Sequence, residues 1–395
     1  MKASVKSLEL SARHRLLRRL PNPMKTYARM AYFMLAAPFG GRRSSNKLKA
    51  QMAVGNTVRI NFIPPTFSIV INSSCNLRCP NCYYVLVGGE HAFEGGGMIK
   101  VDDFKAVIDR YGDYLEQVSL TGGEALAHPR LDQLVDILKS KGIKANVSTN
   151  GVFIERKIET LKKFDYVNVS LDGYDYESFK KYRGGSSAEF DKVIHGLGIL
   201  RENGISFGNS FILSEENLHE VDAMLAFARE TQPFLVNFHN INPMGCEDFT
   251  PLRAGSEKVQ RVLREVTSRT DYPYDVGLPV IIDPDSKNFA SQTCPLQWTM
   301  ACFNDKGHIA YCCYMDHEPE VGNMFDGYDF NSEKMMDFRR RMMKQEYPKD
   351  TCLSCSARFM GQEYGYFHAS QGRWVLQGVA GSGWKVIPFV PSNFV

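Results

Sequence analysis

Short runs rich in β-branched and aromatic residues alternate six times with longer amphipathic stretches between Phe67 and about Asp283. The expected strands are Phe67–Asn72, Gln117–Thr121, Lys144–Thr149, Tyr166–Leu171, Ser206–Leu213 and Phe234–Asn240. The expected helices are Val101–Tyr111, Arg130–Lys141, Ile154–Lys163, Ala188–Glu202, Glu216–Glu230 and Ser256–Ser268. This alternation predicts right-handed β–α–β units around a parallel sheet. Six units suit either an open doubly wound sheet or a partial barrel, and periodicity alone does not choose between them.

The charge of the chain is unevenly distributed. Among 395 residues, 44% are apolar, which is enough for more than one core and excludes a disordered tail, a collagen-like fibre or a small disulfide scaffold. The net charge is +3, but residues 1–50 hold twelve Lys or Arg and one acid, Glu9, so this segment carries +11 and the remainder −8. A basic arm on an acidic body predicts an anionic partner for the arm only, and no nucleic acid is expected to bind the body.

The basic arm has the pattern of two amphipathic helices separated by Pro21. Leucines alternate with arginines before this proline, and the second helix is expected over Met24–Ala37. Such a pair can lie on an anionic membrane surface. The alternative is a helical hairpin packed on the bottom of the barrel. No apolar run approaches the ~18–20 residues of a membrane-spanning helix, and no signal peptide is recognised, so we expect a cytoplasmic protein, peripheral at the membrane if the arm binds there.

The composition of the chain changes from Cys294 onward, where cysteines, glycines and aromatic residues become frequent and the strand–helix alternation stops. A domain boundary is therefore expected near residues 285–293. We expect a basic helical arm over residues 1–60, a β/α domain over 61–290, a small α+β cysteine-rich domain over 291–370 and a tail over 371–395.

Three cysteines directly follow the first expected strand. Cys75, Cys79 and Cys82 form a C-x3-C-x2-C run, and the chain has ten cysteines in all. In a reducing compartment, clustered cysteines are more typical of metal ligands than of disulfides. Three thiolates at this spacing can hold three corners of a [4Fe–4S] cluster and leave one iron open to a small ligand. A zinc knuckle is the alternative.

With these three cysteines, residues 67–270 resemble the radical S-adenosylmethionine (SAM) superfamily. The resemblance implies a partial (β/α)6 barrel with its site at the carboxyl ends of the strands. It also implies that a [4Fe–4S] cluster cleaves SAM reductively to methionine and a 5′-deoxyadenosyl radical, with a flavodoxin- or ferredoxin-type protein as reductant.

The resemblance extends to residues that bind SAM. Gly122, Gly123 and Glu124 end the second expected strand and resemble the family's glycine-rich turn, which receives the SAM amino group. The other contacts that the resemblance implies are Ser170 and Arg183 at the SAM carboxylate, Asn150 at the ribose, and Tyr83, one position after the third cysteine, at the adenine.

A second group of cysteines lies near the C-terminus. Cys294 and Cys312 surround Gly307 in a C-x12-G-x4-C pattern, and Cys352 and Cys355 follow. The pattern resembles the SPASM/Twitch domains of the superfamily, in the shorter Twitch form. The resemblance implies that these four cysteines close a second, auxiliary [4Fe–4S] cluster. A zinc ribbon is the alternative, because cysteine spacing alone does not separate zinc from iron–sulfur ligation.

The expected reaction is hydrogen abstraction followed by a two-electron oxidation, because an auxiliary cluster offers an electron sink. The substrate classes left open are a sugar or cyclitol, a lipid-linked molecule and a ribosomal peptide. Asp283 is a candidate base, and His239 ends the sixth expected strand, where it can line the site.

A radical epimerase is the alternative reaction, with Cys246, Cys302 or Cys313 as hydrogen donor. If none of them is a donor, these three cysteines are chemically quiet thiols. The alternative from another class is a non-catalytic iron–sulfur or zinc protein for cluster assembly or electron transfer.

Overall fold

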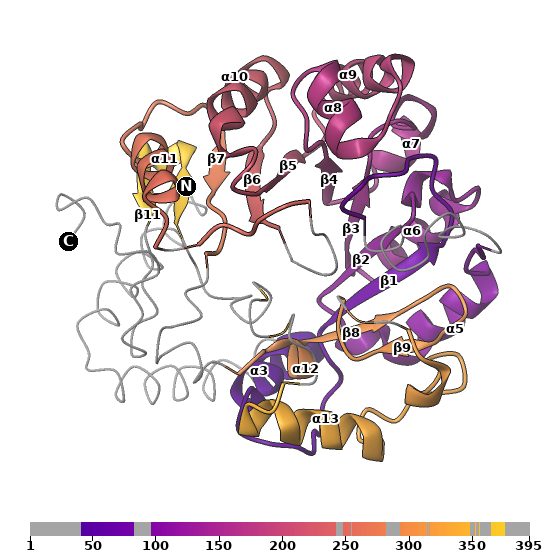
Figure 1. The fold of residues 1–395 in the computed structure, drawn as a ribbon. Coiled ribbons are helices and arrows are strands. Elements are labelled where there is room, and N and C mark those ends of the chain that lie inside the picture. Colours follow the sequence, from indigo (N-terminus) through magenta and orange to yellow (C-terminus); the bar gives the residue numbers. More distant parts are fainter. Residues whose placement is uncertain are drawn as a thin grey trace, which may run out of the picture.

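A curved parallel sheet forms the centre of the molecule (Figure 1). The computed structural model describes residues 41–82, 96–241, 248–253, 255–281, 293–313, 315, 317–347, 352, 355 and 365–375. The first six strands pair in sequence order, and every pair is parallel. They are β1 (Thr66–Asn72), β2 (Gln117–Gly122), β3 (Lys144–Thr149), β4 (Tyr166–Ser170), β5 (Phe207–Leu213) and β6 (Leu235–Asn240). Consecutive parallel pairing in a curved sheet is the arrangement of a partial barrel, which confirms that expectation over the doubly wound sheet.

Helices connect these strands and cover the outer side of the sheet (Figure 1). They are α5 (Val101–Tyr111), α6 (Leu131–Ser140), α7 (Ile158–Leu161), α8 (Tyr176–Arg183), α9 (Ser187–Glu202), α10 (Val221–Thr231) and α11 (Glu257–Thr267). Their apolar residues recur at helical spacing; α5, for example, buries Phe104, Val107, Ile108 and Tyr111 against the sheet. The six expected helices are all present, although α7 is shorter than expected because a 3₁₀ turn, Glu155–Lys157, replaces its first part.

The additional helix α8 was not expected from the sequence, and it ends at the candidate site. Its N-cap Asp175 and its third residue, Ser178, form a reciprocal capping box. Gly184 terminates it with φ +67°, a left-handed conformation that favours glycine. These two caps stabilise a helix of eight residues, and they place its last residue, Arg183, beside the loop of Cys75, Cys79 and Cys82.

Short strands from the last part of the chain extend the sheet at both edges. At one edge, β8 (Met300–Phe303) pairs in parallel with β1, and β9 (Ile309–Ala310) pairs with β8. At the other, β7 (Asp275–Gly277) follows β6, and β10 (Tyr366–His368) and β11 (Arg373–Val375) pair beyond it. Strands of two to four residues are too short for an alternating pattern to reveal them. The cysteine-rich region therefore flanks the barrel on two sides.

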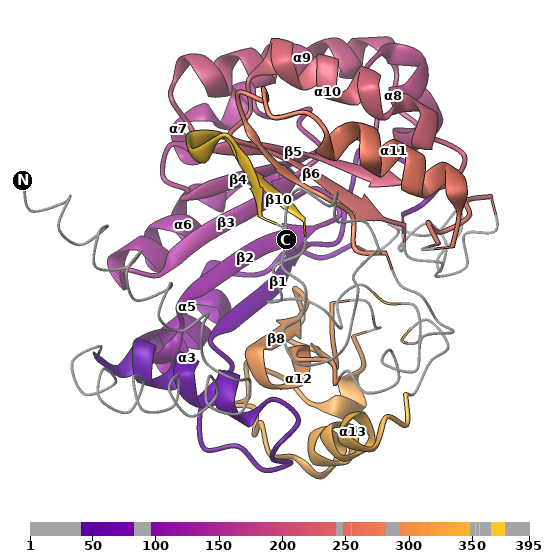
Figure 2. The same ribbon diagram turned by 90° about the vertical axis from the view of Figure 1, so that its left-hand side faces the viewer.

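The amino-terminal end of β1 is covered by helices from both ends of the chain. Figure 2 shows α3 (Gly41–Ala53), α12 (Leu296–Thr299) and α13 (Glu333–Lys344) below β1. Arg339 of α13 is 1% exposed and donates hydrogen bonds to the carbonyl oxygens of Gln297 (3.0 Å), Val58 (3.2 Å) and Phe330 (2.8 Å). Arg339 therefore joins three segments that are distant in the sequence.

The basic arm is described only from Gly41 onward, so the two expected amphipathic helices lie outside the described residues. Helix α3 is fastened to the barrel through Arg43, whose guanidinium donates to the carbonyl oxygens of Gly112 and Gly142. In the described ranges, no helix combines the length and the apolar character that crossing a bilayer requires. Binding of the arm to an anionic surface stays a prediction.

Replacing Arg339 with methionine is expected to lower the free energy of unfolding by about 3 kcal/mol. The methionine keeps most of the aliphatic volume, but three buried carbonyl oxygens lose a charged donor, and leaving such groups unsatisfied costs about 1–3 kcal/mol each without full additivity. Urea denaturation followed by circular dichroism measures the change. Arg340→Met is the matched control on the same helix, because Arg340 is half-exposed and pairs with Asp337 only at the surface. Equal losses in both variants would contradict the assigned role of Arg339.

Candidate functional site

The loop after β1 carries the first cysteine group at the carboxyl end of the sheet. Cys79 is 7% exposed, and Cys75 and Cys82 are partly buried. Burial raises the pKa of Cys79 to about 11, against the opposing positive charge of Arg183, and the neighbouring thiols of Cys82 and Cys75 raise it further. The three thiols therefore share one electrostatic environment, and thiolates are the donors that an iron–sulfur cluster takes.

Three cysteine thiols on one loop are a donor set suited to an iron–sulfur cluster with one open iron. Across the described ranges, no group of three His, Cys, Asp or Glu side chains is arranged to hold an ion. The number, type and spacing of the donors nevertheless fit three corners of a [4Fe–4S] cluster.

Hydrogen bonds fix the start of this loop from two directions. Asn72 donates through Nδ2 to the Glu124 carbonyl oxygen (2.9 Å) and accepts at Oδ1 from the Ser74 N–H (2.9 Å). Ser73 donates through Oγ to Oδ1 of Asp305 (2.7 Å), which lies in the turn between β8 and β9. The loop is thus connected both to the end of β2 and to the cysteine-rich region.

Gly122 and Gly123 allow the end of β2 to approach this loop. Gly122 has φ +152°, and a Cβ there would lie 2.2 Å from the carbonyl oxygen of Asn72. A Cβ at Gly123 would lie 2.3 Å from the carbonyl oxygen of Ser74. Both positions exclude a side chain because the cysteine loop occupies that space. A contact of this turn with the SAM amino group stays a prediction.

Glu124 connects the ends of β2 and β3. Its carboxylate is 1% exposed and accepts hydrogen bonds from the Leu126 N–H (2.9 Å), Thr149 Oγ1 (2.6 Å) and the Asn150 N–H (2.7 Å). Burial raises the pKa of Glu124, and these three donors oppose the increase. The carboxylate therefore has a structural role at the site, and its expected contact with an ammonium group remains untested.

Arg183 and Asp172 form a buried ion pair beside the cysteine loop. Arg183 Nη1 lies 3.0 Å from Asp172 Oδ2, with the two side chains 13% and 3% exposed. Asp172 has φ +54° and accepts the Ile212 N–H at Oδ1 (2.7 Å), so its carboxylate has a fixed orientation. Burial opposes the charge of Arg183, but the adjacent Cys79 thiol and Asp172 raise its pKa on balance.

The ion pair leaves one guanidinium donor free. Arg183 Nε is buried and has no hydrogen-bond partner in the part of the chain that the structure describes. A buried donor without a partner is costly, and a ligand carboxylate would satisfy it. Ser170, which ends β4 and is half-buried, lies on the strand that leads to Asp172. These features fit the expected SAM carboxylate site, and Asp172 adds a buried carboxylate that the sequence analysis did not name.

Of the other expected site residues, the structure describes only some. Tyr83, Cys246 and Asp283 lie outside the described residues, so their roles stay predictions. His239 is near the end of β6, with Nε2 3.0 Å from Nδ2 of Asn237. Its side chain is exposed to solvent, and desolvation by nearby protein atoms lowers its pKa, which the charge of Asp172 opposes.

The second cysteine group interacts electrostatically around Cys294. Burial raises the pKa of Cys294 to about 12, and the thiols of Cys355, Cys313 and Cys352 are close enough to raise it further. Interaction with Cys302, a buried residue of β8, raises the pKa of Cys313. Two of the other expected ligands, Cys352 and Cys355, therefore lie within electrostatic reach of Cys294, and so does Cys313. The assignment of Cys312 as the fourth ligand stays a prediction.

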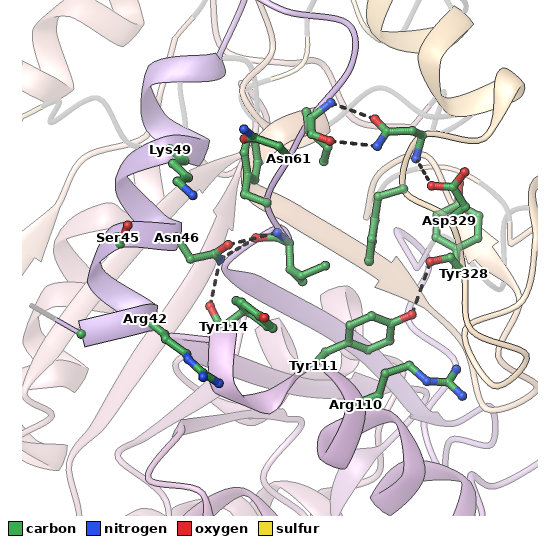
Figure 3. Close-up of a pocket in the computed structure, with 16 residues that line it drawn as sticks. Arg42, Ser45, Asn46, Lys49, Asn61, Arg110, Tyr111, Tyr114, Tyr328 and Asp329 are labelled. Carbon is green, nitrogen blue, oxygen red and sulfur yellow. Dashed lines mark hydrogen bonds between the residues drawn. The ribbon is translucent and has the colours of Figure 1, made fainter. Parts of the chain in front are cut away.

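A separate cavity of about 700 Å³ lies at the opposite end of β1 (Figure 3). Several of its polar groups are hydrogen-bonded to the protein. Asn46 donates to the carbonyl oxygens of Ile63 (2.6 Å) and Tyr114 (3.0 Å), and Tyr111 donates through its hydroxyl to the Tyr328 carbonyl oxygen (3.3 Å). At the rim, Arg42 pairs with Asp113 at 3.2 Å. These contacts make the cavity a junction between α3, α5 and the segment before α13, remote from the cysteine loop.

The geometry at the carboxyl end of the sheet agrees with comparisons to known proteins. Residues 69–228 match the family model described as the radical SAM superfamily. These residues form a radical SAM domain. This radical SAM protein is 32% identical over 171 residues to Fe-coproporphyrin III synthase of Methanosarcina barkeri, which covers 42% of the chain and 41% of the relative. It is 25% identical over 292 residues to the Bacillus subtilis subtilosin biosynthesis protein AlbA, covering 70% of the chain and 62% of AlbA.

The fold of this radical SAM protein is similar to that of Streptococcus suis SuiB solved with bound S-adenosylmethionine. The TM-score is 0.58 at 16% identity, covering 89% of the chain and 81% of SuiB. At this identity the likeness establishes the fold only. For both curated relatives, the Methanosarcina barkeri synthase and AlbA, the chain spans less than two thirds of the relative's length. Their substrates do not transfer with the fold.

Proposed function

We propose that this radical SAM protein oxidises a peptide substrate by two electrons. Cys75, Cys79 and Cys82 would hold the SAM-cleaving [4Fe–4S] cluster, and Arg183 with Ser170 would hold the SAM carboxylate. When bound, these cofactors supply a 5′-deoxyadenosyl radical that abstracts a substrate hydrogen atom, and an auxiliary cluster supplies an electron acceptor. A flavodoxin- or ferredoxin-type protein is the proposed reductant.

The observation that carries the oxidative assignment is the second cysteine group. Cys294 shares its surroundings with Cys352 and Cys355, and the same region reaches the first cysteine loop through Asp305. An iron–sulfur cluster at this position would give the second electron a route out of the substrate. A zinc ion there could not accept an electron. The identity of the metal bound by these cysteines therefore distinguishes the oxidative proposal from the zinc-ribbon alternative.

The peptide is favoured as substrate class by the comparisons. SuiB was solved bound to its precursor peptide SuiA, anSMEcpe was solved with a Cp18Cys peptide, and AlbA is named for the biosynthesis of a bacteriocin. The sugar, cyclitol and lipid-linked substrates remain the alternatives, the last because of the basic arm. The chain's own groups would orient the substrate, exclude water and remove a proton, for which Asp283 is the proposed base.

An assay in heavy water tests both the reaction and the substrate class. The anaerobically reconstituted full chain is incubated with SAM, dithionite and short peptides encoded near its gene, and the products are analysed by mass spectrometry. We expect a peptide that has lost two hydrogen atoms and carries no new carbon-bound deuterium, because an oxidation needs no hydrogen donor. SAM cleavage without consumption of any peptide would contradict the peptide assignment.

The rival reaction, epimerisation, predicts a different product. A thiol donor exchanges its proton with heavy water, so each turnover would place one deuterium on carbon without a net loss of hydrogen. Cys302 and Cys313 interact closely enough to raise the pKa of Cys313, and either thiol could be the donor in that reaction. On the oxidative proposal, Cys246→Ala, Cys302→Ala and Cys313→Ala each retain turnover. Deuterium incorporation that disappears in one of these variants would make the protein an epimerase.

A further inference from the structure

Asn150, at the end of β3, makes a contact with the cysteine loop that its expected role at the SAM ribose does not explain. Its side-chain Nδ2 lies 3.8 Å from the sulfur of Cys75, within reach of a hydrogen bond to sulfur. The same nitrogen donates to Oδ1 of Asn76 at 2.9 Å. One amide nitrogen thus lies within hydrogen-bond distance of two consecutive residues of the loop.

The orientation of this amide is determined by its other partners. Asn150 Oδ1 accepts the Val152 N–H at 3.1 Å, so the oxygen and the nitrogen of the amide are distinguished by what they contact. The Asn150 backbone N–H donates to the Glu124 carboxylate at 2.7 Å, and the residue is 3% exposed. A buried residue held at its backbone and at both ends of its amide has little freedom to turn its N–H groups away from the loop.

We propose that Asn150 donates an N–H···S hydrogen bond to Cys75 that raises the reduction potential of the SAM-cleaving cluster. This inference rests on the proposed function, because Cys75 must be a cluster ligand. Reduction adds negative charge to a cluster and its thiolates, so a donor aimed at a ligand sulfur stabilises the reduced state more than the oxidised state. The Leu77 N–H, 3.4 Å from the same sulfur, is a second donor. Cys75 therefore receives one hydrogen bond from its own loop and one from β3.

The experiment is a redox titration of the full chain, reconstituted anaerobically and without SAM, followed by electron paramagnetic resonance. Asn150→Leu keeps a similar volume but removes both N–H donors. We expect its SAM-cleaving cluster to be about tenfold harder to reduce, which is about 59 mV more negative for one electron. The auxiliary cluster in the same chain is the internal reference and should not shift.

Asn76→Ala is the matched control. It removes the other acceptor of the Asn150 amide, together with the contact of Asn76 with Glu189, but leaves the Asn150 N–H beside the sulfur. Its cluster potential should stay close to that of the unchanged protein. Equal shifts in Asn76→Ala and Asn150→Leu would assign the effect to loosening of the loop and overturn the proposal.

Other outcomes are equally decisive. A normally assembled cluster in Asn150→Leu with an unchanged potential overturns the proposal, and if SAM affinity alone falls, Asn150 is a ribose contact. Absence of any cluster at Cys75, Cys79 and Cys82 in the unchanged protein is instead a failure of the proposed function. If Asn150→Leu does not assemble its cluster, Asn150→Asp is titrated in its place. The aspartate keeps an oxygen acceptor for the Val152 N–H and lacks the two amide donors. An unshifted or raised cluster potential in Asn150→Asp counts against the proposal.

Discussion

Replacing Cys79 with alanine is expected to abolish reductive SAM cleavage and to reduce the iron content from about eight to about four atoms per chain, since each [4Fe–4S] cluster contributes four. Cys79 is the most buried of the three loop cysteines, so no solvent ligand can easily take its place. Formation of 5′-deoxyadenosine with dithionite measures cleavage, and a colorimetric iron assay counts the atoms. The second cluster should persist, because its ligands lie more than 200 residues further along the chain.

The control for this experiment is Cys302→Ala. Cys302 is similarly buried, at 3% exposed, but belongs to neither expected ligand set. This variant should keep both its iron and its SAM cleavage. Surviving cleavage or unchanged iron in Cys79→Ala would remove the assignment of the first cysteine group. If the unchanged protein contains iron but never forms 5′-deoxyadenosine, the non-catalytic alternative of an assembly or electron-transfer protein gains support.

Replacing Arg183 with lysine is expected to raise the dissociation constant for SAM by roughly 10- to 100-fold, because a hydrogen bond from a charged donor contributes about 1.5–3 kcal/mol. Lysine keeps a positive charge near Asp172, which avoids leaving that buried carboxylate unpaired. It loses the planar guanidinium and with it the free Nε donor. Isothermal titration calorimetry of the anaerobic, reconstituted protein measures the constant.

Arg201→Lys serves as the control, since Arg201 is exposed and donates to the carbonyl oxygen of Glu230 far from the cysteine loop. It should leave SAM affinity unchanged. The iron content of Arg183→Lys should also be unchanged, so that weaker binding reports the ligand contact and not a lost cluster. SAM affinity equal to that of the unchanged protein would mean that the free donor of Arg183 faces something other than the SAM carboxylate.

The regular part of the fold could be predicted with good accuracy from the sequence. All six expected barrel strands are present, and their ends differ by at most one residue. Each has a continuous run of strand-forming residues between turn signals, and such a pattern depends only on neighbours in the chain. The helix α8 and the edge strands β8 and β10 were not predicted. Eight residues span only about two helical turns, and strands of three or four residues give too few alternations to define a pattern. Caps stabilise α8, and pairing with β1 or β7 stabilises the edge strands.

By itself, the sequence determined which chemistry the chain can support: the type and spacing of the cysteines, the glycines at the end of β2, and the parallel sheet that brings strand ends to one edge. Only the tertiary structure decided how those groups meet. It places Arg183 on Asp172 and Asn150 beside Cys75, and it brings Cys313 within electrostatic reach of Cys294. The physical reason is that the spacing of residues along a chain encodes only local geometry. The contact of Asn150 with Cys75 joins residues 75 positions apart. It forms only when the sheet has assembled with β3 two strands away from β1.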